Sequence, residues 1–73
     1  MNALHPKKLL LTKWTAVNPV ARNKHFLVSK VIQTEPPELT TEWIEIEAVH
    51  SKTVTRIRWH ELRDASLWRQ GWV

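Results

Sequence analysis

The sequence predicts a mainly β domain. Its 73 residues alternate between segments rich in Val, Ile, Thr and Trp and short polar segments that contain the prolines. The β-rich segments show a period of two and little helical periodicity, which is typical of strands. With no internal repeat and such a short chain, residues 1–73 are expected to form a single small domain.

The first two strands are predicted at 9–17 and 25–32. In the first, Trp14 lies on one face and its neighbours Lys13 and Thr15 on the other. The second segment, taken as a whole, has high β propensity. The dipeptide Asn18-Pro19 starts a turn, so the polar run 18–24 is predicted to be a loop. Residues 1–8 are interpreted as a loose N-terminal arm.

A hairpin follows a proline-containing loop at 33–41. Its strands are predicted at 42–50 and 53–60, where one face alternates apolar and the other charged. A reversal at Ser51-Lys52 places Ile46 opposite Ile57, and Ile44 opposite Trp59. On the other face the same register predicts the pairs Glu47–Arg56 and Glu45–Arg58, each worth about 0.2–1 kcal/mol.

The C-terminal part is predicted to contain one short helical turn before the last strand. Asp64 suits an N-cap, 65–70 the turn, and Gly71 the C′ position, with a closing strand at 72–73. Four or five antiparallel strands with one helical turn before the last are typical of a small SH3-like barrel. The alternative is an open sheet with the Trp68 segment packed across one face.

Five tryptophans and no cysteine indicate how such a small core is stabilised. Each tryptophan buries roughly 150–250 Å². We assign Trp14 and Trp59 to the core, and Trp68 and Trp72 to closing the end of the barrel. In the predicted register, Trp43 falls on the charged face and is the best candidate for an exposed, functional aromatic side chain.

The sequence argues against an enzyme and predicts neither a cofactor nor a metal site. It contains no nucleophile elbow, no glycine-rich phosphate loop and no closely spaced histidine pair. No targeting segment or membrane-spanning stretch is evident, so we expect a cytoplasmic monomer without membrane association.

Charge indicates the class of partner. Residues 1–34 carry six basic residues and no acidic one, 35–47 carry only acidic charges, and the whole chain has a net charge of +4. We therefore predict a non-catalytic module that binds nucleic acid, either RNA or a ribosomal surface. The candidate residues are Lys7, Lys8, Lys13, Arg22, Lys24, Lys30 and Trp43. The alternative is a protein-interaction adaptor with an aromatic groove for a peptide or partner surface.

Several phrases spread over the chain also resemble a known family. They are Pro6-Lys7-Lys8-Leu9-Leu10, Thr12-Lys13-Trp14-Thr15, Lys24-His25-Phe26, Glu47-Ala48-Val49, Trp59-x-x-Leu62-Arg63-Asp64 and Trp68-x-x-Gly71-Trp72. Together they resemble a short, tryptophan-rich bacterial family of hypothetical proteins whose function is unknown. The resemblance implies a free-standing bacterial domain and assigns no role to any residue.

Overall fold

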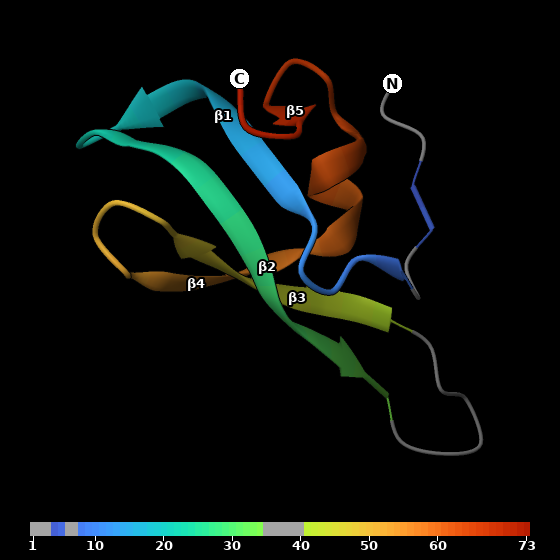
Figure 1. Ribbon diagram of the computed structural model, residues 1–73. Coiled ribbons are helices and arrows are strands. Elements are labelled where there is room, and N and C mark those ends of the chain that lie inside the picture. The colour runs from blue at the N-terminus through green and yellow to red at the C-terminus, as the bar shows by residue number, and fades with distance from the viewer. Residues whose placement is uncertain (1–3, 6–7, 35–40) are drawn as a thin grey trace.

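The computed structural model describes residues 4–5, 8–34 and 41–73, which form one antiparallel sheet (Figure 1). The sheet has five strands in the order β4-β3-β2-β1-β5. The strands are β1 (Lys13–Val20), β2 (Asn23–Gln33), β3 (Thr41–Ala48), β4 (Val54–Arg58) and β5 (Trp68–Gln70), and a 3-10 turn, η2 (Trp59–Arg63), lies between β4 and β5. The mainly β prediction is confirmed, but the sheet does not close into a barrel, because β4 and β5 are its edges.

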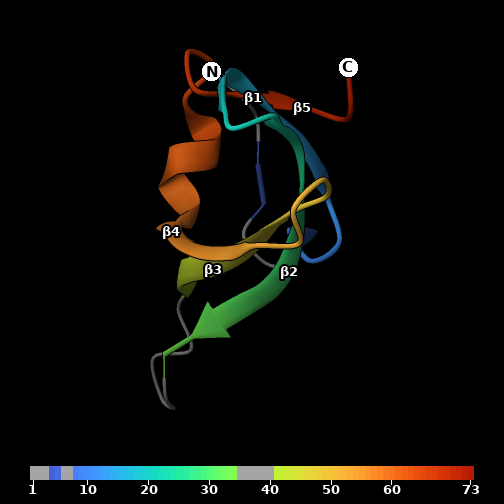
Figure 2. The ribbon, with the colours of Figure 1, turned by 90° about the vertical axis from the view of Figure 1, so that its left-hand side faces the viewer.

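One face of the sheet carries the core. Figure 2 shows the coil of η2 on this side, which we call the inner face, and the C-terminus on the opposite side, the outer face. The largest fully buried side chains include Trp14, Leu9, Ile44, Leu62 and Val28. Trp68 is also buried, so the core assignments of Trp14 and Trp68 agree with the structure, while Trp59 is half-buried against the core.

The predicted strand at 9–17 begins four residues later. Leu9 contributes to the core without being part of a strand, and Leu11 adopts a left-handed φ of 65°. Backbone hydrogen bonds still tie the segment to β2, since Leu11 N donates to Val28 O and Val28 N donates to Thr12 O. Residues 11–12 therefore lie beside β2, and regular pairing starts at Lys13.

The loop predicted at 18–24 is the tip of a β-hairpin. β1 continues to Val20, and only Ala21 and Arg22 connect it to β2. Both have left-handed φ values, 52° and 67°, as in the tight turns that suit two-residue hairpin loops. Proline usually ends a strand, so the prediction ended the first strand before Pro19. In the structure Pro19 lies where the β1–β2 register shifts, between Thr15 and Val20, and a strand tolerates proline at such an irregularity.

The predicted register of the second hairpin is wrong by two residues. Ile44 lies opposite Ile57, and Glu45 opposite Arg56, so neither predicted ion pair is directly opposed. The loop spans residues 49–53 instead of two residues, with Lys52 at a left-handed φ of 63° and its N–H donating to Ala48 O. Because side chains alternate with a period of two, this shift leaves every residue on its predicted face.

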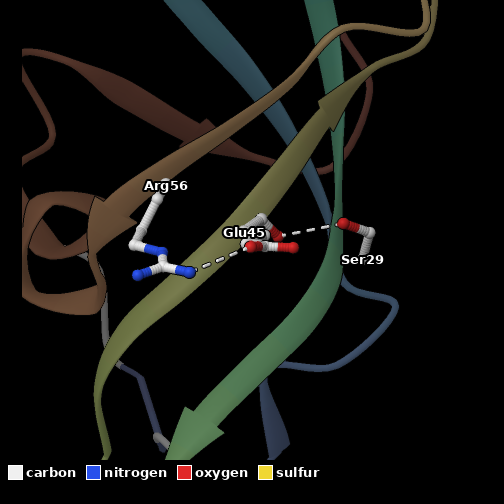
Figure 3. A network of polar contacts seen from close by, with 3 residues as sticks. All are labelled: Ser29, Glu45 and Arg56. Atoms are coloured by element: carbon white, nitrogen blue, oxygen red, sulfur yellow. Dashed lines mark hydrogen bonds and ion pairs between the residues drawn. The ribbon is translucent and has the colours of Figure 1, made fainter.

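The observed register gives the charged face different partners (Figure 3). Arg56 Nη2 lies 3.5 Å from Glu45 Oε2, in a pair that is open to solvent and therefore of small energetic value. The backbone oxygen of Glu45 accepts a hydrogen bond from Ser29 Oγ, at a point where the β2–β3 register shifts. The guanidinium of Arg58 lies 4.7 Å from the ring centre of Trp43.

The helical turn precedes the predicted position 65–70. In η2 the side chains of Trp59 and Leu62 are three residues apart and therefore lie on one side of a 3-10 turn, where both contact the core. Asp64 then accepts hydrogen bonds from Ser66 Oγ and Ser66 N, and these bonds hold the pKa of Asp64 below its usual value. β5 is consequently formed by Trp68–Gln70, and the predicted closing strand at 72–73 does not exist.

The hairpin register can be tested by cross-linking. We expect the double variant Glu45→Cys/Arg56→Cys to form a disulfide, because directly opposed strand residues have Cα atoms about 4.5–5.5 Å apart, within the range that a disulfide spans. The control, Glu45→Cys/Arg58→Cys, should remain reduced under the same oxidant. The chain has no native cysteine, so mass spectrometry reads the result directly. The opposite pattern would restore the register predicted from sequence.

The β1–β2 turn should be open to stabilisation. Asparagine and glycine adopt left-handed φ at lower cost than alanine and arginine, so Ala21→Asn/Arg22→Gly should raise the free energy of unfolding by about 1–2 kcal/mol. Urea denaturation measures the change. Arg22→Ala removes the same charge without relieving the backbone and should give no gain; a double variant no more stable than the wild type would contradict the turn geometry.

Candidate functional site

The C-terminal residues fold back over the outer face of the sheet. Gly71, at a φ of 80°, donates its N–H to Lys13 O and redirects the chain after β5. The hydroxyl of Thr15 then holds the segment at two points: it donates to Gly71 O at 2.6 Å and accepts from Val73 N at 3.1 Å. Thr15 is 2% exposed, so this clamp is shielded from water.

Trp72 is thereby fixed on the outer face. Its Nε1 donates to Phe26 O at 2.9 Å, and its ring stacks on His25 with centroids 5.8 Å apart. Lys13 Nζ lies 4.8 Å from the ring centre. Trp72 remains 42% exposed, the most of the five tryptophans, so its predicted role in closing a barrel end is wrong. The reason is the left-handed turn at Gly71, which sends Trp72 across the sheet.

Two further basic side chains lie near Lys13 or share its face. Arg69 is the β5 partner of Thr15, and opposed residues share a face, so Arg69 lies on the outer face with Lys13. Lys8 and Lys13 both line a hollow beside β1. Arg69, His25 and Trp72 were not among the predicted site residues. Had Trp68-Arg69-Gln70 been predicted as a strand, its period of two would have placed Arg69 on the face opposite Trp68.

The other predicted residues are spread along the sheet. Arg22 and Lys24 are exposed at the hairpin tip, three to five residues along the chain from Leu27, the partner of Lys13. Lys30 is exposed on β2 and opposes Glu45 of β3. Lys7 lies outside the described residues. The described members of the predicted basic set are therefore distributed over the β1–β2 hairpin and the segment before it, and among them only Lys8 and Lys13 line one hollow.

Trp43 lies on the predicted face but is half-buried. It opposes Ile32 on one side and Arg58 on the other, and the Arg58 guanidinium lies over its ring. Trp43 is therefore less accessible than Trp72.

Charge is segregated between the two halves of the sheet. Strands β1, β2 and β5 and the β1–β2 turn contain no Asp or Glu, and their basic residues are Lys13, Arg22, Lys24, Lys30 and Arg69. The described acidic residues all lie from β3 onward up to Asp64: Glu42, Glu45, Glu47, Glu61 and Asp64. We call β2, β1 and β5, with their turn, the basic half-sheet. It combines the acid-free N-terminal region with Arg69, which β5 brings alongside β1.

Two further properties concern the described part of the chain only. It holds no group of three or more His, Cys, Asp or Glu side chains placed to hold a metal ion. None of its helical segments has the length and apolar character needed to cross a bilayer.

The comparisons with known proteins show the family. No curated protein and no solved structure matches the chain significantly. The family model described as tryptophan-rich protein (DUF2389) matches residues 12–73, which include the whole sheet, all five tryptophans and both Lys13 and Arg69. The resemblance inferred from the tryptophan-containing phrases is thus confirmed, and the chain belongs to the tryptophan-rich protein family DUF2389.

Proposed function

We propose that this protein is a small, non-catalytic module that binds single-stranded nucleic acid, with RNA, free or at a ribosomal surface, as the leading ligand. The binding surface is the outer face of the basic half-sheet. We further propose that the sheet is an SH3-like barrel left open between β4 and β5, because its strand order and the 3-10 turn before the last strand suit that architecture.

The observation that carries the proposal is the environment of Trp72. An indole that is 42% exposed contacts Lys13 and His25, and Arg69 shares the same face of a half-sheet whose strands carry no acidic side chain. Proteins that bind single strands combine an aromatic side chain for base stacking with basic groups for the phosphates, and each stacked base contributes about 1–3 kcal/mol. The hydrogen bond from Trp72 Nε1 to Phe26 O holds the indole in place before a ligand arrives.

Strands β1 and β5 supply the basic groups of the proposed surface. Lys13 lies over the Trp72 ring, and Arg69 shares its face through the pairing of Arg69 with Thr15. Lys24 is one residue from His25, so strand alternation does not place it on the outer face. The phosphates of a single strand whose base contacts Trp72 would therefore lie over β1 and β5.

Salt dependence tests the electrostatic part of the proposal. A labelled oligouridine should bind in fluorescence anisotropy at low salt, and the slope of log K against log salt should be about −0.7 per phosphate neutralised. Lys13→Gln and Arg69→Gln should each flatten this slope by about one unit or less. Lys52→Gln, an equal charge change in the exposed β3–β4 loop, should leave it unchanged. An absence of binding at low salt rejects the function.

The stacking role of Trp72 is a separate test. Trp72→Leu should weaken oligouridine binding about tenfold, in line with the loss of one stacked base, while Trp72→Phe, which keeps an aromatic ring, should lose less. Thermal unfolding of both variants checks that the sheet is intact. Equal losses in the leucine and phenylalanine variants would indicate that Trp72 only holds the tail in place and does not stack on a base.

A further inference from the structure

The inner face carries a second surface, which is mainly apolar and so differs from the basic half-sheet. It is a groove of about 350 Å³, within the range of ligand-binding sites. Its walls are mainly apolar and include Val20, Phe26, Ile57, Leu67 and Trp68. The groove exists because the sheet does not close: residues of β4 line it, and so do residues of the β1–β2 hairpin and β5.

The groove and the Trp72 surface face opposite sides of the sheet. Phe26 and Trp68 line the groove, whereas their neighbours His25 and Arg69 lie on the outer face. Successive side chains of a strand point to opposite faces, so both surfaces are available at once. A ligand in the groove therefore does not depend on nucleic-acid binding at the outer face.

One polar side chain of the groove has an acceptor that lacks a donor. Asn23 lines the groove, and Asn23 Oδ1 is buried with no hydrogen-bond partner among the described residues. A buried acceptor without a partner carries an energetic cost, so a ligand N–H that reached this atom would be favoured. Among the described residues, Glu61 is the only charged one that lines the groove. A cationic group is therefore favoured there, and a phosphate is disfavoured by both Glu61 and the apolar walls.

The edge position of β4 indicates the form of the ligand. β4 ends the sheet, so its outer backbone edge has no neighbouring strand, and its inward side chains Thr55 and Ile57 line the groove. An exposed edge beside an apolar groove is the arrangement in which an extended peptide adds as a strand and inserts alternate side chains.

We propose that this groove binds an extended segment of a partner protein that lies along β4. The segment inserts a large apolar side chain between Phe26, Ile57 and Trp68, and a lysine or arginine two residues away, on the same face of the segment, faces Glu61. The protein is then a two-sided adaptor, with a polypeptide on its inner face and a polyanion on its outer face.

Three labelled peptides of equal length, differing only in a central Leu-Ala-Lys, Leu-Ala-Glu or Ser-Ala-Lys sequence, test the proposal by fluorescence anisotropy. The Leu-Ala-Lys peptide should bind most tightly, and Glu61→Gln should weaken its binding about threefold or more without altering the fold, since Glu61 is exposed. Thr55→Phe should fill the groove and abolish binding. The matched control, Val54→Phe, places the same ring on the opposite face of β4 and should leave binding unchanged.

Variants of the two surfaces should each impair one binding activity and leave the other unchanged. Thr55→Phe should leave oligouridine binding intact, and Trp72→Leu should leave binding of the Leu-Ala-Lys peptide intact. Equal binding of the three peptides, no binding at millimolar concentration, or equal effects of Thr55→Phe and Val54→Phe would each overturn the proposal. Displacement of oligouridine by the peptide would also overturn it, because the ligands would then share one surface.

Discussion

The structure depends on covering the inner face of β1, β2 and β3 with a few large side chains. A chain of 73 residues buries only about 60% of the surface it exposes when unfolded, and this one has no disulfide to compensate. Trp14 in β1 and Trp68 in β5 supply much of the cover, together with Leu62 from η2. Trp14 also has a polar partner, since its Nε1 donates to Thr12 Oγ1 at 2.9 Å, so its burial leaves no indole N–H unsatisfied.

Because side chains alternate along a strand, the two faces of the sheet carry different kinds of residue. Because strand neighbours point to opposite faces, each large inner residue has an outer neighbour that packing does not constrain. Trp14 and Trp68 are buried, and beside them Lys13 and Arg69 are exposed. Antiparallel pairing of β5 with β1 then brings the two basic residues to one surface from distant parts of the sequence. The tryptophan content serves both the core and the surface.

The sequence predicted which side chains share a face better than it predicted where strands begin, end and pair. Period-two alternation placed Ile44 and Ile46 inside and Glu45 outside correctly, because face depends only on parity. The pairing of Glu45 depended on the length of the 49–53 loop, and serine, lysine and threonine carry little information about that length. Trp72 was misplaced for a similar reason: a single backbone angle at Gly71 decides whether the chain continues or turns. Long-range pairing of β5 has no local signal.

Gly71 is the only glycine in the chain, and glycine is needed there for its backbone conformation and not for its small size. A Cβ built at this position meets nothing within 4 Å, so space does not require glycine, but the φ of +80° does. The constraint is therefore one of handedness. In a protein short enough for chemical synthesis, a D-alanine at this position would suit the observed backbone and reduce the freedom of the unfolded chain. A single D-residue would thus favour, already in the unfolded chain, the backbone turn that places Trp72 on the outer face.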